Sequence, residues 1–69
     1  MKLDKNTRKS LRIGDILKFS DSEKYIVITI LENRFGGLTA TIQDVFTKRT
    51  IYLIAVSKLY GSEIIREEN

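Results

Sequence analysis

Five basic side chains lie within the first twelve residues, which makes this segment the first candidate for chemistry with anions. They are Lys2, Lys5, Arg8, Lys9 and Arg12, and Asp4 is the only acid among them, so the segment carries a balance of +4. Lysine and arginine neutralise phosphates and release bound counterions, which gives affinity for nucleic acid without sequence preference. A basic terminus can also serve solubility alone, and the composition does not decide between these interpretations.

Two predicted turns add an aromatic ring and more basic side chains. Residues 33–37 read NRFGG, and a turn of this composition has no packing need for Phe35. An exposed Phe35 beside Arg34 can stack on an unpaired base or anchor in the pocket of a partner protein. The alternative is that Phe35 folds back over one end of the domain. Lys48 and Arg49 lie in the second turn as a further basic point, although charged turn residues often do no more than face water.

Catalytic chemistry finds little support in the composition. The chain has no histidine and no cysteine, which removes the usual general base, the thiolate nucleophile and the common zinc ligands. No serine has a candidate base beside it, and the acidic cluster at residues 21–23 is too small for calcium, which takes about six to eight oxygen ligands. We therefore expect a protein that is not an enzyme and that needs no cofactor or metal.

Length and charge set further bounds. Sixty-nine residues suffice for one small domain, which we expect at residues 13–66, between a flexible basic arm at 1–12 and an acidic end at 67–69. Without cysteine no disulfide can form, so stability must come from a well-closed sheet, from homo-oligomerisation or from both. The longest apolar run falls far short of a membrane span, and no apolar segment typical of a signal peptide follows the basic start. These features predict a cytoplasmic protein.

Residues 25–32 (YIVITILE) predict the central strand of the domain. The run is uncharged up to its last residue and rich in β-branched side chains, which pack well on a pleated surface. Both of its faces are largely apolar, with Ile26, Ile28 and Ile30 on one face and Tyr25, Val27 and Leu31 on the other. A strand wet on one side would alternate, so we expect this strand to be covered on both sides.

Four further strands are predicted from alternation and turn chemistry. They cover residues 13–19, 38–46, 51–54 and 63–65, and a single 3₁₀ turn is expected within residues 55–61. The short connections leave no room for a crossover helix, so the strands should form an antiparallel meander. Closure of the meander into a barrel would remove its exposed edges.

The order of these parts resembles the small SH3-like barrels, which include KOW and Tudor-type modules. The resemblance is carried by the tight hairpin at residues 47–50, by the single turn at residues 56–60 and by the pattern Ile13-x-Asp15-x-Leu17-x-Phe19. It implies an all-β, five-stranded antiparallel barrel with a short 3₁₀ turn before the last strand.

Tyr52 and Tyr60 lie near the predicted 3₁₀ turn. Their residue type alone predicts packing in the core or at its rim, with the hydroxyl reaching water. The resemblance implies a second role, because SH3-like barrels commonly place a peptide groove near such tyrosines. With Phe35, they are the candidates for a protein-binding surface.

The segregated charge makes binding of nucleic acid, either DNA or RNA, with little sequence specificity the leading hypothesis. Its candidate contacts are Lys2, Lys5, Arg8, Lys9, Arg12, Arg34, Phe35, Lys48 and Arg49. The alternative is a protein-interaction module, such as a small regulator or inhibitor that docks on a larger protein through an exposed aromatic or a sheet edge. The acidic end and the nearly neutral domain favour this alternative, because nucleic-acid-binding domains usually carry a larger basic excess.

Overall fold

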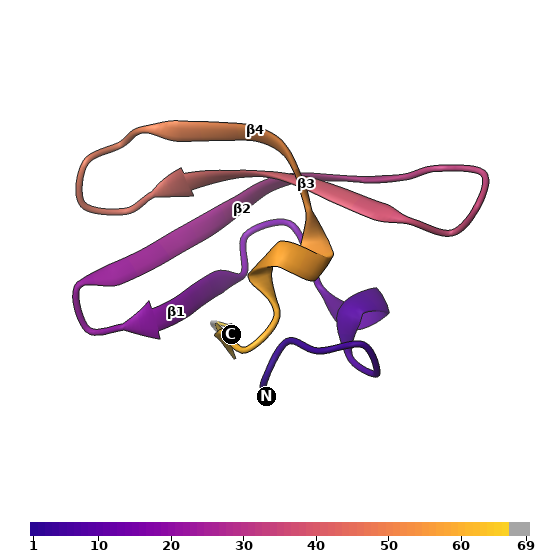
Figure 1. The fold of residues 1–69 in the computed structure, drawn as a ribbon. Helices are drawn as coiled ribbons and strands as arrows, with labels where there is room; N and C mark the ends of the chain where they lie inside the picture. Colours follow the sequence, from indigo (N-terminus) through magenta and orange to yellow (C-terminus); the bar gives the residue numbers. More distant parts are fainter. Residues whose placement is uncertain (67–69) are drawn as a thin grey trace.

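The computed structural model describes residues 1–66, which form one antiparallel sheet with two 3₁₀ turns (Figure 1). The strands are β1 (Ile16–Ser20), β2 (Glu23–Glu32), β3 (Leu38–Asp44), β4 (Thr50–Ala55) and β5 (Glu63–Ile65). Their order is β4-β3-β2-β1-β5, so consecutive hairpins build four strands and β5 returns to pair with β1. The all-β class and the five antiparallel strands are therefore confirmed. No helix in this part of the chain is long and apolar enough to cross a membrane.

The single 3₁₀ turn predicted before the last strand is also confirmed. It is η2 (Val56–Leu59), and its two apolar residues, Val56 and Leu59, are buried. A second turn, η1 (Arg8–Ser10), lies in the N-terminal segment. Within the described residues no pairing joins β4 to β5, so the sheet is open between these two strands. The observed strand pairing therefore does not close the sheet into a barrel.

The first strand is shorter than its alternation predicts. β1 begins at Ile16 rather than at residue 13, because a turn occupies the preceding residues. Gly14 in this turn has φ +95°, a conformation that suits glycine, and its amide donates to the Val27 carbonyl at 2.8 Å. Ile13 is consequently 66% exposed instead of facing the core.

The third strand also ends earlier than predicted, at residue 44 rather than 46. The Asp44 carboxylate accepts the backbone amides of Phe46 at 2.8 Å and Thr47 at 3.0 Å, which bends the chain away from the ladder. These hydrogen bonds hold the pKa of Asp44 below its ordinary value. Phe46 is left exposed in the turn. β2 and β4, in contrast, extend beyond the predicted residues 25–32 and 51–54.

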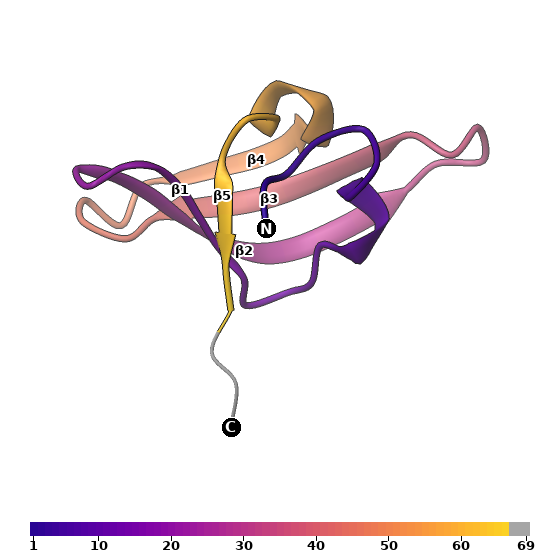
Figure 2. The same ribbon diagram turned by 90° about the horizontal axis from the view of Figure 1, so that it is seen from below.

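The core lies on one face of the sheet, beneath η2 and the N-terminal segment (Figure 2). Its buried apolar residues are Leu3, Leu11, Leu17, Val27, Ala40, Ile42, Val56, Leu59 and Ile64. The prediction that β2 is covered on both faces is wrong, because Leu31 is 56% exposed and Ile28 is exposed as well. A chain of this length provides only one layer to cover the sheet, and that layer lies on the core side.

The first twelve residues pack against the sheet, which corrects the prediction of a flexible arm. Leu3 is completely buried, and Leu11 belongs to the same core. The Leu3 amide donates to the Ser62 carbonyl at 2.8 Å. Asp4 and Thr7 close the following turn, because each side chain accepts the backbone amide of the other, at 3.0 and 2.9 Å. The segment is therefore part of the domain, and its backbone positions the basic side chains.

Asp15 and Arg66 connect the end of β5 to the segment before β1. Arg66 donates from Nε to Oδ1 of Asp15 at 2.8 Å and from a terminal nitrogen to Oδ2 at 2.7 Å. The same carboxylate accepts the Arg12 amide, and Arg66 also donates to the Ser10 carbonyl. Burial raises the pKa of Asp15, but the hydrogen bonds and charges of Arg66 and Arg12 outweigh this effect and hold the pKa below its ordinary value. The predicted acidic end, at residues 67–69, lies outside the described residues.

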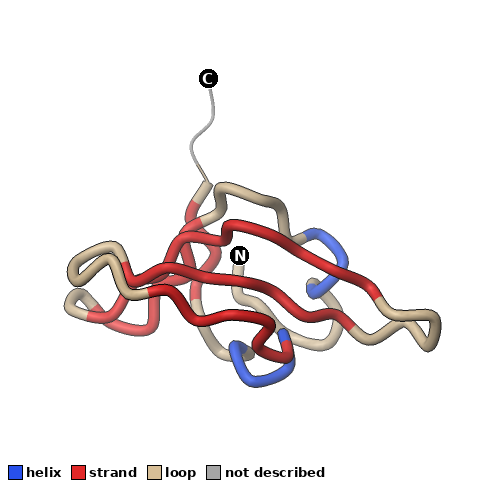
Figure 3. The backbone as a smooth tube through the Cα atoms, turned by 90° about the horizontal axis from the view of Figure 1, so that it is seen from above, coloured by secondary structure: helices blue, strands red, loops and turns tan. Residues whose placement is uncertain are grey.

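The two ends of the sheet carry different turns (Figure 3). The β2–β3 hairpin projects from one end, and the β1–β2 and β3–β4 turns lie at the opposite end. The β3–β4 turn lies against the start of β2, where the Val45 amide donates to the Lys24 carbonyl at 3.1 Å. Any binding site on the turns must therefore belong to one end or the other.

Candidate nucleic-acid interface at the β2–β3 hairpin

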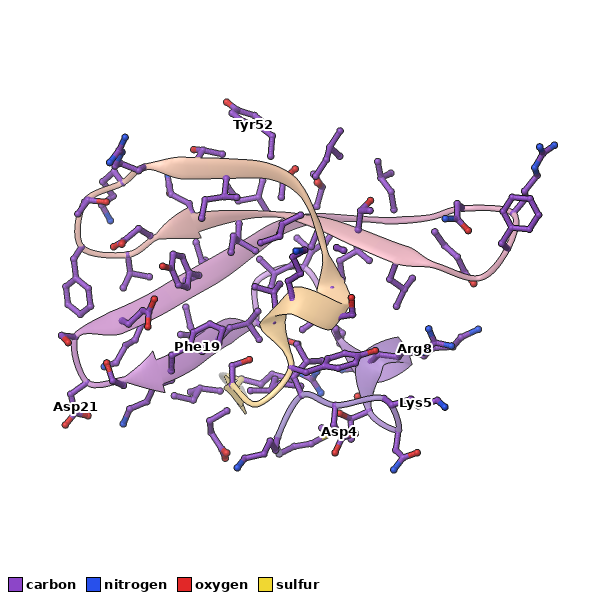
Figure 4. All side chains as sticks on the ribbon, viewed as in Figure 1. Asp4, Lys5, Arg8, Phe19, Asp21 and Tyr52 are labelled. Atoms are coloured by element: carbon purple, nitrogen blue, oxygen red, sulfur yellow. The ribbon has the colours of Figure 1, made fainter. Side chains whose placement is uncertain are left out.

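The predicted basic residues are divided between the two ends of the sheet. Arg8 lies beside the base of the β2–β3 hairpin, and Lys5 points to solvent from the same N-terminal segment (Figure 4). Lys48 and Arg49 lie in the β3–β4 turn at the opposite end. The nine predicted contacts therefore do not form one continuous surface.

Four of the predicted contacts lie away from the hairpin: Lys2, Arg12, Lys48 and Arg49. Lys2 forms an isolated backbone bridge with Glu63 of β5, and Arg12 lies beside the Asp15 carboxylate. Lys48 adopts φ +66° to close its turn, and its carbonyl accepts the Gln43 side chain at 3.1 Å. The candidate site consequently narrows to Lys5, Arg8, Lys9, Arg34 and Phe35.

Asn33 organises the turn that presents Phe35. Its Oδ1 accepts the backbone amides of Phe35 at 2.8 Å and Gly37 at 2.9 Å, and its own amide donates to the Gly37 carbonyl. Gly36 has φ +83°, which a side chain would disfavour. These backbone interactions close the hairpin without any packing from the phenylalanine ring.

Phe35 is 83% exposed and projects from the tip of the hairpin. Arg34 lies over its ring, with 5.1 Å between the guanidinium carbon and the ring centroid, which is a cation–π contact. The interpretation that Phe35 covers one end of the domain is therefore wrong. The ring is available to stack on a base or to enter a partner's pocket.

A hollow of about 230 Å³ opens at the base of the hairpin, and we name it the Arg8 groove. Its polar lining comes from Arg8 of η1, Asn33 and Thr39 of the hairpin, and Ser57 and Tyr60 of η2 and the residue after it. The apolar residues Leu38, Ala55 and Val56, together with Gly37, complete the lining. Within residues 1–66, no carboxylate lies within ion-pair distance of the Arg8 guanidinium. The groove thus combines an unpaired cation with hydroxyl and amide groups, a set of donors that suits a phosphate.

A second hollow of about 290 Å³ adjoins the Arg8 groove and shares Arg8 and Leu38 with it. Lys9 and Glu32 line this hollow, with 3.5 Å between Nζ and Oε1. Both side chains are more than half exposed, so this ion pair contributes little to stability. The four cations of the candidate site, Lys5, Arg8, Lys9 and Arg34, outnumber the two carboxylates of the neighbouring residues Asp4 and Glu32.

The two candidate tyrosines have different surroundings. Tyr60 packs against the core and lines the Arg8 groove, as predicted for a residue at the rim. Tyr52 points away from the core on β4 and is 75% exposed, so the prediction of packing is wrong for it (Figure 4). The strand bulges at this point, because Leu53 has φ +53° and donates its amide to the Thr41 hydroxyl instead of to a β3 carbonyl.

Sequence reasoning did not single out Asn33, Thr39 or Ser57 as site residues. A local signal existed only for Asn33, because asparagine commonly opens turns through hydrogen bonds to the following amides. Thr39 and Ser57 join the groove because β3 and η2 meet in the folded chain, which no local pattern indicates. In the part of the chain that the structure describes, no three acidic side chains gather as a metal ion would need.

The chain was also compared with known proteins. No protein-family model, no curated protein and no solved structure matches it. What the site does must therefore be inferred from its residues and their geometry.

Proposed function

We propose that this protein is a non-catalytic module that binds single-stranded nucleic acid, with little sequence specificity, at the β2–β3 hairpin end. The observation that carries the proposal is the exposed Phe35, held beside Arg34 at the tip of a turn that does not need its ring for packing. Proteins that bind single strands combine a stacking aromatic with a cationic surface that follows the backbone. Both parts are found at this end of the molecule.

In this proposal Phe35 stacks on one base, and Arg8, Lys5 and Arg34 neutralise neighbouring phosphates. Every base has an aromatic face, so stacking provides affinity without selecting a sequence. The Tyr60 hydroxyl in the Arg8 groove supplies a hydrogen bond to a phosphate or sugar oxygen, a contact that positions the strand without reading it. A double helix offers no unpaired base to the ring, so single strands are the preferred ligand.

For the fold, we propose that the sheet curls into an SH3-like barrel. The order β4-β3-β2-β1-β5 supports this assignment, since it brings the first and last strands together. The position of η2 between β4 and β5 in the chain gives further support. In Figure 2, β5 runs across the layer of β2, β3 and β4, as curling of the sheet requires.

The site is best tested by point variants, because deletion of residues 1–12 would also remove Leu3 and Leu11 from the core. Binding of short fluorescent oligonucleotides is measured by anisotropy. Phe35→Ala should weaken binding about tenfold, since one stacked base contributes about 1–3 kcal/mol. The matched control is Phe46→Ala, which removes another exposed phenylalanine from a turn at the opposite end. Equal losses for the two variants, or none for Phe35→Ala, contradict the proposed site.

The alternative function is that of a protein-interaction module. The observation in its favour is β4, an edge strand without charge or proline, with Tyr52 exposed on it. The unpaired backbone of an edge strand can accept an extended segment of a partner. This alternative predicts that the wild-type protein binds no oligonucleotide, and that Tyr52→Ala reduces binding of the partner protein.

A further inference from the structure

Five isoleucines lie on the outer side of β1, β2 and β5 and in the loop before β1, and we name them the isoleucine patch: Ile13, Ile16, Ile26, Ile28 and Ile65. The strand register sets Ile16 between Ile26 of β2 and Ile65 of β5 in one row across three strands. All of these except Ile28 line a hollow of about 580 Å³, which is larger than the two hollows at the hairpin end. Within the described residues no element packs over the patch.

The patch departs from the usual pattern of a sheet face that meets water. Outward positions of an antiparallel sheet with one solvated face are normally polar. The next outward-facing row, two residues further along β1, follows this rule, because it consists of Lys18 between Lys24 of β2 and Glu63 of β5. The isoleucine row does not obey it. Contiguous apolar side chains with a polar rim are typical of an interaction surface.

We propose that the isoleucine patch binds a second copy of this chain in a two-fold dimer whose axis runs along the outer face of β1. This axis sets Ile16 against Ile16 of the second copy and each Ile26 against Ile65 of the other. The same patch thereby serves both copies, as a two-fold interface requires. The dimer does not depend on the nucleic-acid site, which lies at the hairpin end.

The three central members of the charged row, Lys24, Lys18 and Glu63, support a second copy as the occupant, because this part of the row is complementary to itself about the same axis. Lys2, bridged to Glu63, continues the row beyond this part. Each Lys24 comes opposite Glu63 of the other copy, so two pairs of opposite charge form. Lys18 falls on the axis, where its charge is already matched by Asp21 of its own chain at 2.9 Å. Glu63 also holds the amino terminus of its own chain, in an exposed contact at 3.1 Å that leaves its second carboxylate oxygen available.

The area of the patch predicts a weak dimer. The exposed parts of the five isoleucines, with the flanking Lys24 and Glu63, amount to roughly 500 Å² per copy, so a pair would bury about 1,000 Å². This area is at the lower limit for a specific interface. We therefore expect reversible dimerisation at concentrations of tens to hundreds of micromolar.

Sedimentation equilibrium of the full chain over a concentration series tests the proposal. The mass should rise from 8.0 kDa toward twice that value as the concentration increases. Ile13→Lys and Ile65→Lys should each raise the dimer dissociation constant at least tenfold. Both residues are exposed, and far-UV circular dichroism checks that each variant folds. The matched control is Leu31→Lys, a similar exposed residue of β2 outside the patch, which should dimerise like the wild type. A monomer at every concentration overturns the proposal.

A charge exchange tests the orientation of the two copies. Lys24→Glu places like charges opposite each other and should weaken the dimer at least tenfold, and the double variant Lys24→Glu with Glu63→Lys should restore it. Restoration supports the two-fold axis along β1, because it requires these two residues to meet between copies. If the double variant dimerises no better than the single one, the proposed arrangement is overturned.

Discussion

Replacement of Asp15 by asparagine should remove a large part of the stability of this domain. Asp15 is only 2% exposed, and its carboxylate binds two nitrogens of Arg66 and the Arg12 amide. Removing one partner of a buried ion pair typically costs about 3–5 kcal/mol. We take about 3 kcal/mol, because the Arg66 side chain is one-quarter exposed and can regain some hydration. A domain of this length has a total unfolding free energy of roughly 3–10 kcal/mol, so the variant is at the margin of folding.

The measurement is urea denaturation followed by far-UV circular dichroism, at neutral pH and in acid. With a slope of about 1 kcal/mol per molar urea for a small protein, the midpoint should fall by about 3 M in Asp15→Asn. The pKa of Asp15 is lowered in the folded state, so its contribution is fully present above its ordinary pKa of about 3.9 and is lost as the pH falls through the folded-state pKa. In acid the wild type should therefore lose the stability that the Asp15 carboxylate contributes, whereas Asp15→Asn lacks this contribution at every pH.

The matched control is Asp21→Asn, which breaks the ion pair with Lys18. The Asp21 side chain is 96% exposed, and an exposed pair of this kind contributes little, so the midpoint should stay near that of the wild type. Two results would refute the reasoning about Asp15. One is a similar midpoint for Asp15→Asn and Asp21→Asn at neutral pH, and the other is an equal loss of stability in acid for Asp15→Asn and the wild type.

Three further variants test the fold. Leu3→Ala should lower the unfolding free energy by about 2–5 kcal/mol in a urea titration, since Leu3 is completely buried, and a change of a few tenths would show that the N-terminal segment does not pack. Gly36→Ala should cost about 1–2 kcal/mol because of its φ of +83°, and unchanged thermal stability would contradict this turn geometry. Phe35→Ala should leave the unfolding free energy within about 0.5 kcal/mol of the wild type, and a larger loss would mean that the ring packs on the domain.

Features that depend on local chemistry were predictable from the sequence. The spacing of Val56 and Leu59 predicted η2, and the last strand has the predicted bounds, Glu63–Ile65. The glycines of residues 33–37 predicted the β2–β3 hairpin, and the exposed phenylalanine was one of two open alternatives. In each case a few neighbouring residues determine the backbone conformation.

The packing of the N-terminal segment could not be predicted in this way. Leu3 and Leu11 are single apolar residues among polar ones, without the period of a helix or a strand. They are buried because residues far along the chain receive them: Leu3 is hydrogen-bonded to Gly61 and Ser62, and Leu11 lies beside Ile30 of β2 and Leu38 of β3. The position of Arg8 depends on this packing, so the Arg8 groove could not be predicted from the sequence either.

The apolar residues on both faces of β2 led to the prediction that the chain itself covers both faces, and this prediction is wrong for one face. Val27 faces the core as predicted, whereas Ile28 lies on the uncovered face. A pattern of this kind indicates that both faces avoid water, but it does not say that one chain provides both covers. The proposed dimer through the isoleucine patch supplies the second cover for part of the strand.

The central claim is that single-stranded nucleic acid binds at the hairpin end, and the salt dependence of oligonucleotide binding tests it most directly. Each phosphate contact on a single strand contributes about −0.7 to the slope of log K against log salt concentration, so Lys5, Arg8 and Arg34 predict a slope of about −2. Arg8→Gln should reduce its magnitude by about 0.7, whereas Arg49→Gln at the opposite end should leave it unchanged. The absence of binding even at low salt, or an equal reduction by both variants, would contradict the account.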